Sequence, residues 1–243
     1  MENLTKNDEL IIGDEGTLNA KMQRRSFLRY AGAGAAAMSV LAACKNNNDV
    51  TPSGNASIDV GSGDVGILNY AYALEQLEAA FYIQAVKGSG FASLSVQEQA
   101  YITDIRDHEV AHREFFKAAL TAAAPTNIIP ALTPDFSKVD FTTRAGILAQ
   151  AKAFEDTGVS AYNGAGYLIV NPVYLVLAGK IVSVEARHAA TIRDLLSYGS
   201  FSDSTVVSTS TGLETSRTPG QVLVIANAYL AAGSKISANS LPI

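Results

Sequence analysis

The sequence of 243 residues has few of the residue types on which several common kinds of site depend. It contains one cysteine, three histidines and no tryptophan. A single cysteine excludes an intramolecular disulfide framework and a zinc site built from clustered cysteines. A formal net charge of −5 without a block of basic residues argues against nucleic-acid binding. The hydrophobic content of 48% excludes a wholly disordered chain, and the length fits one or two ordinary domains with a sizeable core.

The sequence also lacks a long hydrophobic run. The apolar run at residues 30–43 is shorter than the roughly 20 residues that a membrane-spanning helix needs. It follows the pair Arg24-Arg25 and ends in Leu-Ala-Ala-Cys44, an order typical of a secretory signal. The arginine pair with the following Ser-Phe-Leu-Arg resembles a twin-arginine signal, which exports folded proteins. Leu-Ala-Ala-Cys resembles a bacterial lipobox, in which the cysteine is lipidated.

Composition and pattern divide the chain into four parts. Residues 1–43 are expected to be the signal peptide, and residues 44–63, rich in Asn, Ser, Gly and Asp, a flexible tether. Residues 64–198 are expected to form a helical bundle, and residues 199–243 a Ser/Thr-rich loop with a C-terminal helix. We expect the export machinery and, through lipidated Cys44, a lipid membrane as partners. The protein would then lie in the bacterial cell envelope, on the periplasmic side or at the outer membrane.

Helix signals dominate the sequence after the tether. Ser95 and Glu98 form a capping box, Asn171-Pro172 restarts a helix, and Pro219 precedes another. The only weak strand candidate is residues 204–208. The predicted helices cover residues 64–86, 95–123, 141–168, 172–197 and 220–232.

The connection between the second and third predicted helices is long and contains three prolines. About 17 residues can cross a bundle some 30 Å tall, whereas a short loop would make neighbouring helices antiparallel. We therefore predict an all-α fold: a four-helix bundle with a long crossover between helices 2 and 3, plus a short fifth helix.

One arrangement of glutamate, tyrosine and histidine occurs twice along the four long helices. It consists of Glu-x6-Tyr on one helix and Glu-x-x-His on the next. Seven residues are close to two helical turns, and residues three apart share a face, so each motif places its side chains on one side of its helix. The two copies are Glu75, Tyr82, Glu109 and His112, then Glu155, Tyr162, Glu185 and His188.

Four carboxylates and two imidazoles suit a pair of transition-metal ions. The pattern resembles the ferritin-like superfamily of di-iron and di-manganese carboxylate proteins, most closely the branch that includes desiccation-related proteins. The resemblance covers about residues 64–198. It implies bridging ligands at Glu109 and Glu185 and terminal glutamates at Glu75 and Glu155. The ligand set that it implies is Glu75, Glu109, His112, Glu155, Glu185 and His188.

Three features of the pattern stay open. Glu78 lies within one turn of the Glu75 face and could replace it as a ligand. The aspartate that often precedes the glutamate in related oxidases is absent, with His108 and Val184 in its place, so His108 is a candidate neighbour of the ligands. Tyr82 and Tyr162 are candidates for contact with the ligands, for a radical site, or for plain packing.

A competing motif overlaps the first Glu-x-x-His. Residues 108–112 read His-Glu-Val-Ala-His, the zinc peptidase signature in which the glutamate is a general base. That interpretation needs a third ligand downstream, and it leaves the second copy of the repeat unused. We therefore rank a zinc peptidase third among the functions considered.

The resemblance implies two iron ions as cofactors, with manganese as the alternative. An oxidoreductase of this kind would act on ferrous iron or on oxygen species such as peroxide. The rival interpretation is a non-enzymatic envelope protein of the stress response or a scaffold with the same fold. The oligomeric state stays open.

Overall fold

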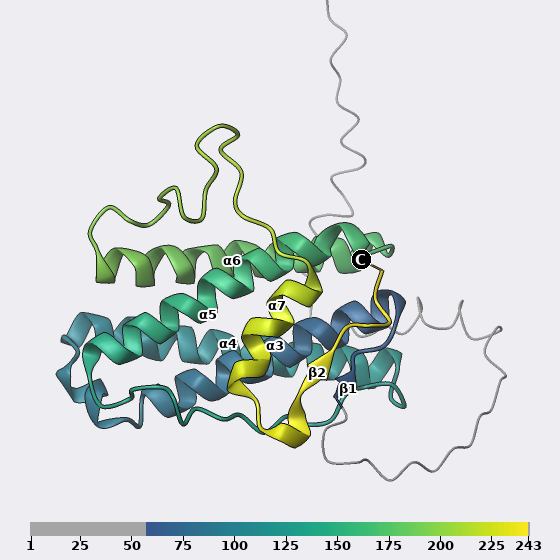
Figure 1. Ribbon diagram of the computed structural model, residues 1–243, viewed down its shortest axis with the longest axis horizontal. Helices are drawn as coiled ribbons and strands as arrows, with labels where there is room; N and C mark the ends of the chain where they lie inside the picture. The colour runs from purple at the N-terminus through teal and green to yellow at the C-terminus, as the bar shows by residue number, and fades with distance from the viewer. Residues whose placement is uncertain (1–56, 243) are drawn as a thin grey trace, which may run out of the picture. The chain divides into compact units, whose positions relative to one another are not determined.

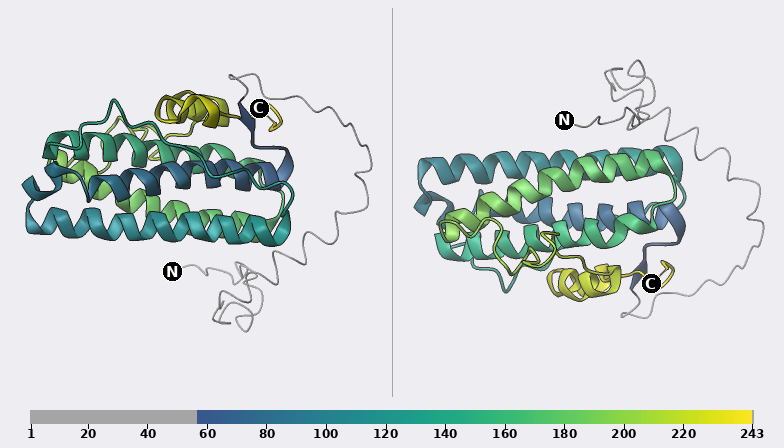
Figure 2. Two further views of the ribbon diagram at one scale, coloured as in Figure 1. Left: turned by 90° about the horizontal axis from the view of Figure 1, so that it is seen from below. Right: turned by 90° about the horizontal axis from the view of Figure 1, so that it is seen from above.

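The computed structural model describes residues 57–242; the arginine pair, the apolar run and Cys44 lie outside them. Figures 1 and 2 show the long helices side by side, with a short helix on the flank of the bundle. The predicted all-α bundle with a fifth, C-terminal helix is confirmed. The helices are α3 (Gly63–Ala85), α4 (Val96–Ala123), α5 (Arg144–Ala165), α6 (Pro172–Leu196) and α7 (Pro219–Ala226).

Local capping signals set where the helices begin. The predicted capping box opens α4: Ser95 Oγ accepts from the Glu98 amide, and Glu98 Oε2 accepts from the Ser95 amide at 2.8 Å. Asn171 caps α6 before Pro172. The third helix begins later than predicted, because Thr143 Oγ1 accepts from the Gly146 amide and so starts α5 at Arg144.

The four long helices pack mainly as two pairs. The 3-10 turn η1 (Ser89–Ser93) lies in the connection from α3 to α4, and η2 (Gly166–Leu168) lies in the connection from α5 to α6. The chain between the pairs, residues 124–143, runs lengthwise along the bundle, which is the predicted crossover (Figure 1). Within residues 57–242, no helix combines the length and the apolarity that a membrane span requires.

Two buried amide side chains of α3 hold the crossover in place. Asn69 Nδ2 donates to the Asn127 carbonyl at 2.7 Å, and the Ile129 amide donates to Asn69 Oδ1 at 3.1 Å. The Leu132 amide donates to Gln76 Oε1 at 2.8 Å. These bonds supply partners for backbone groups that an irregular segment would otherwise leave unpaired, so the crossover can lie against the bundle.

The two ends of the described chain meet in a strand pair that the sequence did not predict. Strand β1 (Ile58–Asp59) pairs in parallel with β2 (Ile236–Ser237), while Val207 in the predicted strand region forms only an isolated bridge with Glu214. Strands of two residues are too short to show an alternating pattern. The pairing also shows that the folded part begins before residue 63, the end that we expected for the flexible tether.

The C-terminal helix is shorter than predicted. It ends at Ala226 rather than near residue 232 and continues as the 3-10 turns η3 (Asn227–Tyr229) and η4 (Ala232–Ser234). The Asp135 amide donates to the Tyr229 carbonyl at 2.8 Å, and the Ala231 amide donates to the Thr133 carbonyl at 2.9 Å. The chain therefore leaves the helix because its backbone bonds to the crossover.

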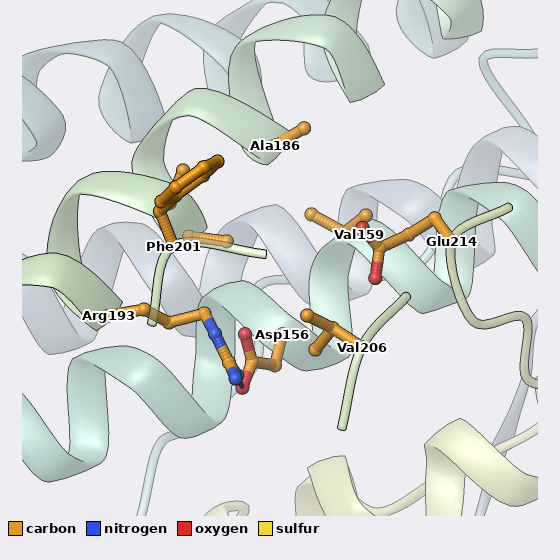
Figure 3. A pocket seen from close by; sticks show the side chains of 9 residues that line it. Asp156, Val159, Ala186, Arg193, Phe201, Val206 and Glu214 are labelled. Carbon is orange, nitrogen blue, oxygen red and sulfur yellow. Dashed lines mark hydrogen bonds and ion pairs between the residues drawn. The ribbon is translucent and has the colours of Figure 1, made fainter. Parts of the chain in front are cut away.

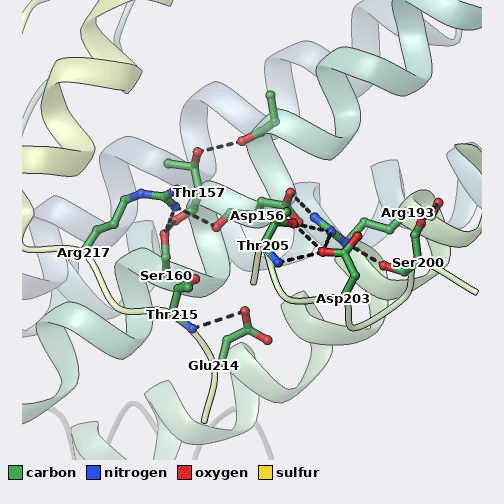
Figure 4. Close-up of polar contacts among 11 residues, drawn as sticks. Asp156, Thr157, Ser160, Arg193, Ser200, Asp203, Thr205, Glu214, Thr215 and Arg217 are labelled. Carbon is green, nitrogen blue, oxygen red and sulfur yellow. Dashed lines mark hydrogen bonds and ion pairs between the residues drawn. The ribbon is translucent and has the colours of Figure 1, made fainter. Parts of the chain in front are cut away.

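The loop between α6 and α7 is fastened by two arginines (Figure 4). The Arg193 side chain is 1% exposed; it donates to Asp156 Oδ2 at 2.6 Å and forms an ion pair with Asp203 at 2.7 Å. The Arg217 amide donates to the Ser160 carbonyl at 3.0 Å. A Cβ on Gly164 would lie 1.7 Å from the Arg217 carbonyl oxygen, so only glycine allows this close approach.

Candidate metal centre

The structure brings the six predicted ligand residues together between the four long helices. Their ligand atoms form two groups, and within each group all atoms lie within 4.8 Å of one another. Both groups contain Glu109 and Glu185, the residues predicted to bridge. The first group is Glu75, Glu109, His112 and Glu185, and the second is Glu109, Glu155, Glu185 and His188.

Helix periodicity explains why these side chains meet. Each Glu-x-x-His places a carboxylate and an imidazole on the same face of α4 or α6, and each of α3 and α5 adds one glutamate. All four glutamates are 0% exposed. Four buried carboxylates at one point are costly unless cations or hydrogen-bond donors accompany them.

Many of the buried ligand atoms have no hydrogen-bond partner among the described residues. These are one oxygen each of Glu75 and Glu155, both oxygens of Glu109 and of Glu185, and Nδ1 of each histidine. His112 Nδ1 lies 3.0 Å from Glu185 Oε1 and 3.4 Å from Glu75 Oε2, but neither contact meets the geometry of a hydrogen bond. The nitrogen and the oxygens therefore face a shared space, and this donor set fits a pair of metal ions.

Burial and neighbouring charges raise the pKa values of three glutamates of the cluster and lower the pKa of the fourth. Burial raises the pKa of Glu75 to about 7 and raises the pKa values of Glu155 and Glu185 above the usual range. Burial also opposes the ionisation of Glu109, but the two neighbouring histidines outweigh it and lower the pKa of Glu109 to about 2. Glu109 is thus the carboxylate most readily ionised at neutral pH.

The carboxylates act on the histidines in turn. Burial disfavours the charged imidazole, but Glu109 and Glu155 raise the pKa of His188 to about 10. Glu109, Glu185 and Glu75 likewise raise the pKa of His112 well above its usual value against the effect of burial. Without a metal, the cluster therefore holds protons that a metal ion would have to displace.

The two tyrosines of the repeat contact glutamates of the opposite copy. Tyr82 on α3 donates to Glu155 Oε1 on α5 at 2.5 Å, and Tyr162 on α5 donates to Glu75 Oε1 on α3. The seven-residue spacing predicts that each tyrosine shares a face with its own glutamate, and the helix packing adds this exchange between the copies. Each bond holds one oxygen of a glutamate and leaves Oε2 toward the cluster.

His108 lies behind His188, one of the two histidines of the cluster. Its Nδ1 is 2.9 Å from His188 Nε2, and the two rings are within 10° of parallel. When His188 Nε2 carries the proton and donates it to His108, His188 Nδ1 keeps a free lone pair toward Glu109 and Glu155. The second copy has Val184 in the position of His108, and a valine side chain offers His112 no such bond.

This geometry does not match the zinc peptidase interpretation. In that interpretation, both histidines of the His-Glu-x-x-His motif bind the same metal ion. Here His112 faces the glutamate cluster, whereas His108 is exposed and belongs to neither ligand group.

The sequence offered Glu75 and Glu78 as alternative ligands, but the structure buries both of them at the cluster. Glu75 belongs to a ligand group, but Glu78 is also buried, at 4% exposed, beside the cluster. Burial and the nearby glutamates, Glu185 first, raise the pKa of Glu78 well above its usual value. Gly158 lies against it on α5, and sequence reasoning missed this residue. Comparing the two copies would have found it, because Gly158 follows Glu155 by three residues as Glu78 follows Glu75.

A separate pocket lies between α5, α6 and the loop after α6 (Figure 3). Its volume is about 240 Å³, including space open to solvent, and its lining contains none of the six predicted ligands. Arg193 in its wall donates to Asp156 of α5 and to Thr205 of the loop, so the pocket is part of the loop attachment. The residues that line it are Asp156, Val159, Ala186, Ala189, Ala190, Arg193, Phe201, Val206 and Glu214.

Comparison with known proteins agrees with the fold and the cluster. The ferritin-like domain family matches residues 63–198, which is more than half of the chain, so this protein belongs to that family. The match includes all four long helices and the whole glutamate and histidine cluster. A search among curated proteins gives no match.

Proposed function

We propose that this protein is an exported, lipid-anchored ferritin-like protein that binds a dinuclear metal centre, with iron as the metal. The observation that carries the proposal is the pair of ligand groups that share Glu109 and Glu185. One shared pair of carboxylates with one further glutamate and one histidine on each side is the donor set of a two-metal site.

The residues divide into distinct roles in this proposal. Glu109 and Glu185 would be shared by the two metal positions. Glu75 with His112 and Glu155 with His188 would complete the two positions, and the tyrosines hold the outer oxygens of Glu75 and Glu155. Burial excludes water from the carboxylates, which makes their interaction with a cation stronger than it would be at a surface.

A site of imidazole and carboxylate ligands suits iron or manganese better than it suits metals that prefer thiolate ligands. When bound, two iron ions would supply redox chemistry and coordination positions for oxygen or peroxide. We therefore propose ferrous iron, oxygen or peroxide as the substrates, with a manganese-loaded form as the alternative.

Elemental analysis of the purified protein beside a Glu109→Gln, Glu185→Gln double variant tests the metal centre. We expect two iron or manganese ions per chain in the wild type and their loss in the double variant. Glu98→Gln is a matched control, because Glu98 is also buried but caps α4 outside the cluster. One zinc ion per chain that survives in the double variant would contradict the proposal in favour of a peptidase. Absence of metal from the wild type would favour a scaffold.

The proposed location has its own test. The twin-arginine and lipobox motifs support export and attachment through Cys44. Membranes of cells that express Cys44→Ala should release the protein into the soluble fraction, whereas the wild type should stay with the membranes. Equal membrane retention of both proteins would contradict the lipid anchor and leave the metal centre unaffected.

A further inference from the structure

Glu78 is a buried carboxylate that the six-residue ligand set does not use. It lies on α3 one turn after Glu75, is 4% exposed, and its Oε2 has no hydrogen-bond partner among the described residues. A buried carboxylate oxygen without a donor is costly to keep unless a cation joins it. The position of Glu78 beside four other buried glutamates makes that cost larger.

The facing helix provides space for this carboxylate. A Cβ on Gly158 of α5 would lie 2.9 Å from Glu78 Oε1 and 3.3 Å from Glu185 Oε2. The carboxylates of Glu78 and Glu185 therefore both lie over the Cα of Gly158, and any larger residue there would push Glu78 away.

The two copies of the repeat differ at this position, so the two halves of the bundle are unequal: one carries Glu78 and the other carries Gly158. Gly158 occupies in the second copy the position that Glu78 has in the first, three residues after the terminal glutamate. A glutamate at both positions would place two side chains in the same space. The bundle thus holds one additional carboxylate, on one side only, next to the bridging Glu185.

We propose that Glu78 is a fifth carboxylate ligand of the dinuclear centre, that Gly158 makes room for it, and that it favours trivalent over divalent metal ions. This inference rests on the proposed function. Four carboxylates balance the charge of two divalent ions, whereas two trivalent ions bring two more positive charges into the same buried space. Glu78, adjacent to Glu185, supplies a negative charge where that excess arises. It therefore stabilises the oxidised centre more than the reduced one.

The test compares two properties of the iron-loaded protein in the wild type, Glu78→Gln and Gly158→Ala. The first property is the affinity for ferrous iron, titrated without oxygen; the second is the midpoint reduction potential of the bound iron. Glu78→Gln should leave the ferrous affinity within about threefold. It should raise the potential by about 59 mV or more, since tenfold loss of preference for the oxidised ion equals 59 mV for one electron. Gly158→Ala keeps the carboxylate but occupies its place, so the potential should rise in the same direction.

Two variants serve as controls. Gly179→Ala adds the same methyl group to α6, where nothing lies within 4 Å, and Glu98→Gln removes a buried carboxylate outside the cluster. Neither should shift the potential. A wild-type protein that binds two iron ions, with Glu78→Gln at the wild-type potential, would overturn this inference and leave the proposed function intact. An equal shift in the controls would also overturn it. A wild type that binds no metal would overturn both.

Discussion

Removal of metal should make the stability of this protein fall as the pH rises. Glu75, Glu155 and Glu185 have raised pKa values in the folded state, and His188 has a pKa of about 10. A raised pKa means that the folded state holds a proton that the unfolded chain has already released. Because the folded apoprotein binds more protons than the unfolded chain, its free energy of unfolding decreases with pH in this range.

Glu75 sets a scale for the effect. Its contribution is fully present below pH 4.5, the usual pKa of glutamate, and is lost as the pH rises through about 7. A pKa raised from 4.5 to about 7 corresponds to about 3 kcal/mol of unfolding free energy, a large fraction of the stability of an ordinary domain. His188 adds a second decline, which begins near pH 6.5 and continues toward pH 10.

Groups with lowered pKa values do not reverse this trend. Glu109, with a pKa of about 2, is ionised above pH 5 in both the folded and the unfolded state. Its contribution is present above about pH 4.5 and is lost as the pH falls toward 2, so it affects only the acid side. The apoprotein should therefore be most stable near pH 5.

Urea unfolding of the chelator-treated protein, followed by circular dichroism between pH 5 and pH 8, measures this decline. Metal ions displace the protons of the cluster, so the metal-loaded protein should lose much less stability over the same range. Glu75→Gln removes the glutamate whose share is about 3 kcal/mol and should make the apoprotein decline less steep. An apoprotein whose unfolding free energy stays constant or increases between pH 5 and pH 8 would refute the reasoning.

Three further substitutions test the surroundings of the cluster. Arg193→Met should destabilise the protein by about 1–3 kcal/mol in urea unfolding, because it removes the buried guanidinium that pairs with half-buried Asp156; a loss below 1 kcal/mol would contradict the role of Arg193 in fastening the loop. His108→Ala should weaken metal binding about 10–100-fold in equilibrium dialysis by releasing His188, whereas Val184→Ala should leave it nearly unchanged; equal effects of the two variants would contradict this positioning role. Gly164→Ala should cost about 1–3 kcal/mol, because its Cβ would overlap a loop carbonyl, and wild-type stability would show that the loop can move away.

The sequence predicted the helices well because their signals are local. The capping box at Ser95 and the Asn171-Pro172 restart act on backbone groups a few residues away, and both determine the helix starts as expected. Helix boundaries failed where a distant segment competes for the backbone. The end of α7 at Ala226 is such a case, because the following residues bond to the crossover.

The candidate site likewise has some features that depend on local spacing and others that depend on the packing of distant helices. The sequence alone determined that two Glu-x-x-His units and two further glutamates lie on helix faces, since a helix brings residues three apart to one side. It also determined the crossover, because only a long segment can return along the bundle. These features depend on spacing within one helix or one connection.

Only the tertiary structure decided which helix faces which. The exchange of Tyr82 and Tyr162 between the copies, the contact of His108 with His188, and the position of Glu78 over Gly158 all join side chains on different helices. Such contacts depend on the rotation and the axial offset of packed helices, which the side chains of the whole core determine together. The sequence therefore determined the residues that can meet at the centre, and packing decided their actual partners.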